Sequence, residues 1–142
     1  MTASTERHGR CLCGQVTVSA VAAGPGFGAC HCRSCRRWAG GPLLATECGA
    51  DVRFAGEAHI GVYASSDWAE RGFCRECGTH LFWRLKAPVV YMIPVGLFDE
   101  DADWTFAEQV FIDEKPAFYA FANATRELTA AEVIAEYDPQ GP

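Results

Sequence analysis

The chain has 142 residues, of which 49% are hydrophobic and 21% charged, a composition typical of one globular domain that we expect to span 1–142. Its formal net charge of −6 argues against nucleic acid as the main partner. Residues 1–10 lack the apolar core of a secretory signal, and no apolar run reaches the roughly 20 residues that cross a bilayer. We therefore expect a cytoplasmic protein with no membrane partner, whose eight cysteines bind metal more readily than they form disulfides.

Six short segments have the alternating, β-branched pattern of strands, with glycine or proline between them. They are 15–20, 43–47, 52–54, 59–63, 80–85 and 89–95. Many short strands at this spacing predict a mainly β, antiparallel, meandering fold. Only two helices are expected. One is a short turn at 34–38 before Gly40, and the other covers 129–136, where Thr129 and Glu132 form a capping box.

Two cysteine pairs, each followed by glycine, precede predicted strands, the first pair before the strand at 15–20 and the second before the strand at 80–85. They are Cys11-Leu12-Cys13-Gly14 and Cys74-Arg75-Glu76-Cys77-Gly78. A structural zinc takes four thiolate or imidazole ligands, so the two pairs make one closed site. The glycine allows a positive φ after the second ligand and turns amide groups toward the sulfurs. Because this site joins Cys13 to Cys74, 61 positions apart, we interpret it as a structural staple.

A third cluster, Cys30-His31-Cys32-Arg33-Ser34-Cys35, holds three cysteines within six residues. No second cysteine pair remains to complete it, so a zinc bound there has three thiolate ligands and an open coordination position. An open position is what distinguishes catalytic from structural zinc, because it can bind and activate a thiol, water or carbonyl. We therefore predict two zinc ions per chain and assign the chemistry to Cys30, Cys32 and Cys35.

The fourth ligand of this second zinc is left open by the sequence. His31 is expected to face away from its neighbours, because alternate side chains of an extended segment point to opposite sides. His59, His80 and Cys48 are possible ligands. Cys48 lies in an apolar strand and fits a small core residue better, and His80 fits the face of a strand.

Other arrangements of the cysteines were weighed. A disulfide between Cys11 and Cys13 would be strained, and the pair Cys74 and Cys77 lacks the βαβ context of a thioredoxin-like redox motif. The serious competitor is one structural zinc together with a reactive thiol cluster that binds no metal.

The ordered cysteine motifs resemble those of the glutathione-dependent formaldehyde-activating enzyme family. The motifs that carry the resemblance are Cys11-Leu12-Cys13-Gly14, Cys30-His31-Cys32-Arg33-Ser34-Cys35-Arg36 and Phe73-Cys74-Arg75-Glu76-Cys77-Gly78-Thr79-His80-Leu81, in a motif-bearing core at about 9–95. The resemblance implies a β-tent-like fold with two zinc ions. It places the structural zinc on Cys11, Cys13, Cys74 and Cys77, and the catalytic zinc on Cys30, Cys32 and Cys35.

The activity that the resemblance implies is that of an S-(hydroxymethyl)glutathione synthase, a carbon–sulfur lyase that joins glutathione to formaldehyde. The glutathione thiol is expected at the open zinc position. Arg33, Arg36 and Arg37 surround the catalytic cluster and are expected either to bind the glutathione carboxylates or only to offset the thiolate charge. Trp38 is expected to line the substrate pocket. The alternative function is a zinc-stabilised binding module without catalysis.

The acidic segment Asp99-Glu100-Asp101-Ala102-Asp103 imitates the start of a calcium-binding loop. Trp104 and Val110 stand where such a loop requires glycine and glutamate, so we expect a solvated acidic turn instead.

Overall fold

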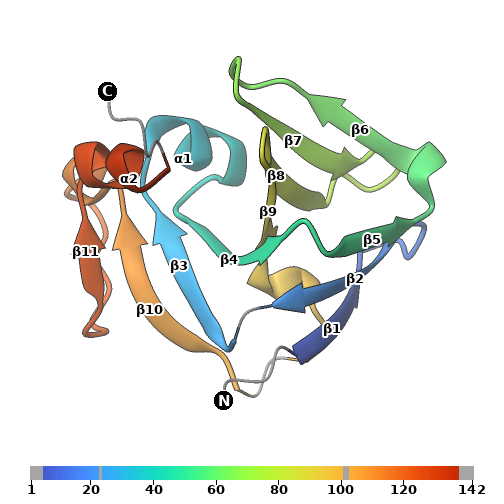
Figure 1. The fold of residues 1–142 in the computed structure, drawn as a ribbon, viewed down its shortest axis with the longest axis horizontal. Coiled ribbons are helices and arrows are strands. Elements are labelled where there is room, and N and C mark those ends of the chain that lie inside the picture. Colours follow the sequence, from blue (N-terminus) through green and yellow to red (C-terminus); the bar gives the residue numbers. More distant parts are fainter. Residues whose placement is uncertain (1–4, 23, 101–102, 138–142) are drawn as a thin grey trace. The chain divides into compact units, whose positions relative to one another are not determined.

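A computed structural model describes residues 5–22, 24–100 and 103–137 (Figure 1). Contacts within the chain define two compact units that are interleaved in sequence. Unit 1 consists of Met1–Gly26 and Ala45–Trp104, and unit 2 of Phe27–Leu44 and Thr105–Pro142. Each cysteine cluster lies within one unit, the four-cysteine set in unit 1 and the three-cysteine set in unit 2.

Unit 1 contains a three-stranded antiparallel sheet and a longer antiparallel meander. The sheet has the order β1 (Thr5–Arg10), β2 (Thr17–Ala22), β5 (Val52–Ala55). The meander has the order β4 (Leu43–Gly49, of which the part from Ala45 belongs to unit 1), β9 (Val89–Pro94), β8 (His80–Lys86), β7 (Ala69–Cys74), β6 (Ile60–Tyr63). Two 3-10 turns, Glu57–His59 and Val95–Leu97, connect these strands.

The core of unit 1 is built from the inward side of these strands. In β2 alternate residues are buried, so that Val18, Ala20 and Ala22 all face the core. Phe82, with 2% of its surface exposed, packs edge-on against Tyr91 with ring centroids 5.2 Å apart. The buried cysteines Cys11 and Cys74 belong to the same core, so the four-cysteine site is anchored in the core of the unit.

Unit 2 is a small α+β arrangement. Its strands β3 (Gly26–Cys30), β10 (Thr105–Val110) and β11 (Arg126–Leu128) lie side by side, and β10 pairs with β11 in parallel. Figure 1 shows the helices α1 (Arg33–Ala39) and α2 (Ala130–Tyr137) at the end toward which β3 and β10 run. The 3-10 turn Ile112–Glu114 follows β10. The arrangement brings the first turn of α1 and the segment after β10 to the same end of the unit.

The predicted fold class, mainly β with two short helices, is confirmed, and all six predicted strands coincide with observed ones to within a few residues. Both helices form where expected. Gly40 ends α1 with a φ of 82°, and the reciprocal bonds of Thr129 and Glu132 cap α2 at 2.9 and 3.3 Å. Five strands, β1, β3, β7, β10 and β11, were not predicted, and the parallel β10–β11 pair departs from the antiparallel expectation.

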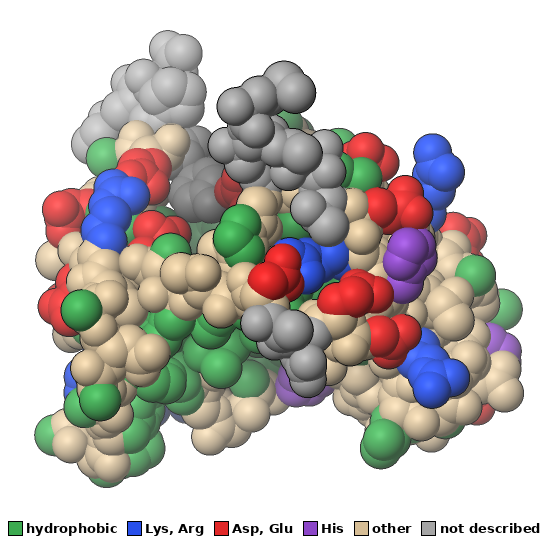
Figure 2. All heavy atoms as spheres, turned by 90° about the horizontal axis from the view of Figure 1, so that it is seen from below, with side chains coloured by type: hydrophobic (Ala, Val, Ile, Leu, Met, Phe, Trp, Pro, Cys, Tyr) green, Lys and Arg blue, Asp and Glu red, His purple; other side chains and the backbone are tan. Residues whose placement is uncertain are grey.

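Acidic side chains are interspersed with Lys and Arg side chains on the face drawn in Figure 2. No helix within the described ranges is long and apolar enough to span a membrane. Asp101 of the predicted acidic turn lies outside the described residues. That a single domain spans 1–142 stays a prediction.

Candidate metal centres and an arginine-lined hollow

The structure brings the four cysteines of the two glycine-flanked pairs together in unit 1. All four sulfurs lie within 4.8 Å of one another, with separations of 3.6 Å between Cys11 and Cys13 and 3.8 Å between Cys13 and Cys74. Four sulfurs at the usual zinc–sulfur distance, arranged as a tetrahedron, would be about 3.8 Å apart. The donor set and its spacing therefore fit a zinc ion that closes on four thiolates.

The two glycines that follow the pairs have the predicted backbone conformation. Gly14 has a φ of 81° and Gly78 a φ of 80°, and in both cases the glycine N–H donates to the carbonyl of the first cysteine of its pair. This turn points further amides at the sulfurs, since the Val16 N–H donates to Cys11 Sγ at 3.3 Å. A side chain at Gly14 or Gly78 would meet no atom within 4 Å, so it is the backbone conformation that favours glycine there.

The thiols of this cluster differ in pKa, because their sulfurs have different hydrogen-bond partners. The Thr79 hydroxyl, 3.2 Å from Cys77 Sγ, and the Thr79 backbone lower the pKa of the Cys77 thiol to about 5. A backbone hydrogen bond from Gln15 lowers the pKa of Cys13, but partial desolvation and the three neighbouring sulfurs together outweigh it and raise this pKa to about 12. As the pH rises, Cys77 therefore loses its proton before Cys13 does.

The three-cysteine cluster forms where β3 ends and α1 begins. Cys30 is the last residue of β3, Cys32 is the N-cap of α1, and Cys35 is buried in the first helical turn. Their sulfurs lie within 4.8 Å of one another. Cys32 Sγ accepts a hydrogen bond from the Cys35 N–H at 3.3 Å, so the cap that begins the helix also fixes one sulfur of the cluster. Among the described residues of unit 2, no fourth ligand atom joins them.

His31 points away from the cluster, as predicted. Its side chain is completely buried, with Nε2 2.8 Å from Gln109 Oε1 and Nδ1 2.8 Å from the Tyr119 hydroxyl. Burial lowers the pKa of His31, so the ring is held neutral. His31 therefore joins the cluster to β10 and to the segment around Tyr119 without offering a ligand.

The three arginines next to the cluster line a hollow. It is bounded by Arg33, Arg36, Arg37, Gly40, Gly41, Phe118 and Tyr119. Arg36 Nε donates to the His31 carbonyl at 2.8 Å, which anchors this guanidinium beside the cysteines. None of the three guanidiniums forms an ion pair with a carboxylate among the described residues. Three guanidinium groups that pair with no carboxylate of the described residues therefore border this hollow.

The remaining candidates lie elsewhere. Trp38 is half-buried in α1 but is not among the residues that line the arginine hollow, so its role in a pocket stays a prediction. His59 is 3.6 Å from Glu76, and His80 is the first residue of β8; both belong to unit 1. Cys48 is a core residue, as predicted, and burial raises the pKa of its thiol to about 12.

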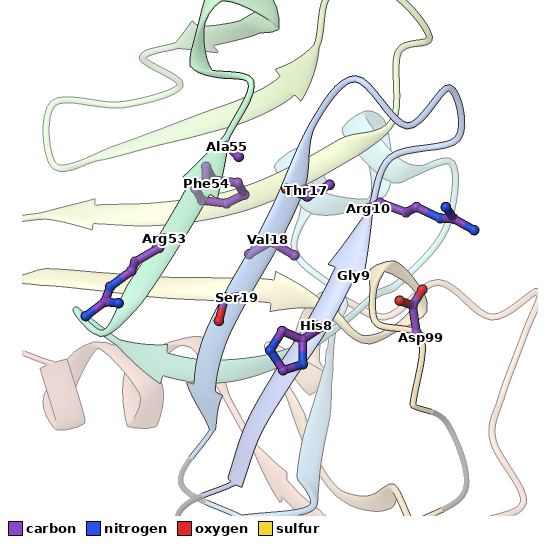
Figure 3. Close-up of a pocket in the computed structure, with 10 residues that line it drawn as sticks. All are labelled: His8, Gly9, Arg10, Thr17, Val18, Ser19, Arg53, Phe54, Ala55 and Asp99. Carbon is purple, nitrogen blue, oxygen red and sulfur yellow. The ribbon is translucent and has the colours of Figure 1, made fainter.

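A second hollow was not anticipated from the sequence. It lies over β1, β2 and β5 in unit 1, where Figure 3 shows Arg10 and Arg53 extending away from each other on its two sides. Neither its lining nor that of the arginine hollow contains a cysteine. The two hollows differ in their cationic groups, because Arg10 and Arg53 extend away from each other here, whereas three arginines border the hollow in unit 2.

Gln109 and Tyr119 are the site residues that sequence reasoning missed. They meet His31 from 78 and 88 positions away, and neither belongs to a motif of fixed spacing. Aromatic residues are concentrated in 111–121, which was the one available signal that this segment packs against something.

These features, a mainly β fold with four cysteines in one cluster and three in another, define a class of cysteine-rich proteins whose clusters could each hold a metal ion. The model of the glutathione-dependent formaldehyde-activating enzyme family matches residues 6–114, and the chain belongs to this family. It is similar to an uncharacterized lyase of Schizosaccharomyces pombe, with 39% identity over 132 residues that cover 91% of this chain and 95% of the relative.

A crystal structure of a Rhodobacter sphaeroides protein is similar in fold. It has a TM-score of 0.59 and 24% identity, and the match covers 67% of this chain and 90% of that one. At this identity the likeness bears on the fold alone.

Proposed function

We propose that the protein is a zinc-dependent carbon–sulfur lyase that joins glutathione, or a similar small thiol, to formaldehyde or a related small aldehyde, and also splits the adduct. In the joining direction the sulfur forms a bond to the aldehyde carbon. The carbon–oxygen double bond becomes a C–O–H single bond, and the proton lost by the thiol is balanced by the proton gained by the oxygen. Family membership and the three-cysteine cluster support this proposal.

Cys30, Cys32 and Cys35 would hold the catalytic zinc, and Cys11, Cys13, Cys74 and Cys77 the structural one. A zinc held by three thiolates supplies Lewis acidity that favours the ionised form of a substrate thiol at neutral pH. The protein's own residues would position this zinc and its ligands. The N-cap of α1 fixes one sulfur, His31 ties the cluster to β10, and a reducing cytoplasm keeps the cysteines available as ligands.

The observation that carries the proposal is the arginine hollow beside the cluster. Glutathione has two carboxylates, and Arg33, Arg36 and Arg37 offer guanidinium groups with no carboxylate partner of their own in the described chain. Because Arg36 uses only Nε for the His31 carbonyl, its two terminal nitrogens are left to form a bidentate contact with a carboxylate. The thiol of a bound glutathione would then be delivered to the cysteine cluster in a defined orientation.

The test is titration calorimetry with glutathione on the zinc-loaded protein. Arg36→Ala should weaken binding by about 1.5–3 kcal/mol, roughly 10- to 150-fold, the range for a charge-assisted hydrogen bond. Arg53→Ala is the matched control, because it removes an arginine from the other hollow and should leave the affinity unchanged. Turnover is then followed by NMR exchange between glutathione and its hydroxymethyl adduct.

Absence of glutathione binding at millimolar concentration would leave the non-catalytic zinc module as the better description. Binding without any acceleration of the exchange would retain the thiol but remove formaldehyde as the substrate.

A further inference from the structure

The strand β6 forms the outer edge of the meander in unit 1, and among the described residues it pairs with β7 alone (Figure 1). Natural proteins protect such edges with a charged side chain, a proline, a bulge or a very short strand. The segment 60–66 contains no proline and no Asp, Glu, Lys, Arg or His, and β6 pairs with β7 without a bulge. Apart from its length of four residues, β6 therefore has none of these protections.

The hydrogen-bond pattern identifies which residues of β6 face its open side. The Arg75 N–H donates to the His59 carbonyl at 2.7 Å, so these residues are a hydrogen-bonded pair of the antiparallel ladder between β7 and β6. Hydrogen-bonded pairs alternate with pairs whose N–H and C=O groups point outward. Gly61 and Tyr63 therefore bond to β7, and the residues between and beside them direct their backbone groups to the open side.

Three residues, Ile60, Val62 and Ala64, thus face the open side. The Ile60 N–H is already used in the preceding 3-10 turn, where it donates to the Glu57 carbonyl. The groups that remain are the C=O of Ile60, both groups of Val62 and the N–H of Ala64, and no described residue bonds to them. This edge consequently presents two donors and two acceptors that only another extended chain or water can satisfy.

A second copy of β6 satisfies all of these groups. When two β6 strands pair antiparallel about a two-fold axis at Val62, the two Val62 residues exchange both of their backbone hydrogen bonds. Each Ala64 N–H then meets the Ile60 carbonyl of the other copy, which makes four hydrogen bonds in all. Moving the axis to Gly61 would leave the Val62 carbonyl without a donor, because the Ile60 N–H is occupied.

The side chains of this edge favour a second copy over an unrelated strand. Val62 and Tyr63 are 47% and 67% exposed, and pairing about Val62 covers both. It places Tyr63 opposite Gly61 of the other copy, on the face where the Phe73 ring lies over Gly61. The glycine leaves room for the tyrosine ring to pack on Phe73. Although each copy has a net charge of −6, no acidic side chain within 60–66 opposes the approach.

We infer that β6 is a dimerisation edge, at which two copies of this chain pair antiparallel about a two-fold axis at Val62. The inference is independent of the proposed function. The pairing joins the meanders of two copies into one continuous sheet. Because one short strand from each copy makes a small interface, we expect a weak dimer with a dissociation constant of roughly 10–100 µM.

The test is sedimentation velocity of the reduced, zinc-loaded protein between about 1 µM and 1 mM, a range in which the wild type should change from monomer to dimer. Val62→Lys and Val62→Asp each bring like charges together on the axis, so each variant alone should stay monomeric. An equal mixture of the two should form a heterodimer, because Lys then faces Asp. Ile134→Lys, the same change at a half-exposed side chain in unit 2, is the matched control and should dimerise as the wild type does.

Hydrogen exchange measured by NMR locates the contact independently. The amides of Val62 and Ala64 should exchange more slowly as the protein concentration rises, whereas those of Gly61 and Tyr63, which bond to β7, should not change. A wild type that stays monomeric at the highest concentration overturns the inference and leaves the edge open to a strand of another protein. A dimer that persists in Val62→Lys, or a mixture that stays monomeric, overturns it as well, because the contact is then not centred on Val62.

Discussion

The two metal centres should differ in what they contribute to folding, and the difference can be estimated from the positions of their cysteines. The four-cysteine site joins Cys13 to Cys74 over 61 positions, whereas the three-cysteine site spans only the five positions from Cys30 to Cys35. The entropy of closing a flexible loop gives about 3.6 kcal/mol for the first and about 1.4 kcal/mol for the second. Removing the long staple should therefore cost more stability than removing the short one.

The perturbation is Cys74→Ala, with Cys35→Ala as its matched control. Both cysteines are buried, at 0% and 5% exposure, so the loss of a buried sulfur affects the two variants about equally. For a chain of this length each kcal/mol corresponds to about 3–5 °C in Tm. Cys74→Ala should therefore lower Tm by roughly 10–18 °C, and Cys35→Ala by roughly 4–7 °C.

The assay is thermal unfolding of the reduced, zinc-loaded proteins by circular dichroism, with zinc content measured on the same samples. A chelator should lower the Tm of Cys35→Ala further by roughly 10–18 °C, because its long staple is intact, and that of Cys74→Ala only by the roughly 4–7 °C assigned to the short site. Equal falls in Tm for the two variants would refute the assignment of a structural and a chemical site.

Two further predictions concern the metal and the thiols. Metal analysis should give about two zinc ions per chain. Cys32→Ala should reduce the count to about one, while circular dichroism shows that the fold is retained. A count of one in the zinc-reconstituted wild type would mean that the three-cysteine cluster holds no metal. In metal-free protein, Cys77 should be alkylated by iodoacetamide at pH 6, because a pKa lowered to about 5 leaves its thiolate populated above that pH, whereas Cys48, with a pKa raised to about 12, should stay unmodified until the protein unfolds. Peptide mass mapping over a pH series measures both, and Thr79→Val should move the onset for Cys77 to higher pH.

Local patterns predicted those parts of the molecule that depend on local interactions. The two turns that end at Gly14 and Gly78 were predictable from the spacing of cysteine and glycine, and α2 from a capping box of four consecutive positions. The strand β3 was missed because Gly26-Phe27-Gly28 breaks the alternating apolar pattern, and a residue larger than glycine at position 28 would press on Glu108. Its place depends on pairing within the unit, which no short window of sequence reports.

The same distinction applies to the site. The cysteine clusters and the adjacent arginines could be predicted because the residues that form them lie within a few positions of one another in the sequence. The contacts of His31 with Gln109 and Tyr119 were not, because they span 78 and 88 positions and involve residue types that are common in any core. Only the fold brings those side chains together.

The interleaving of the two units also determines the order in which each site can exist during synthesis. Cys30, Cys32 and Cys35 leave the ribosome as one short segment and can capture a metal ion early, whereas the other site must wait until Cys77 has been made. Neither unit is a continuous stretch of chain, since each is assembled from two segments. A continuous fragment that contains all of unit 1 must therefore also contain 27–44, and with it Cys30, Cys32 and Cys35, so no truncation isolates the four-cysteine site from the three-cysteine cluster.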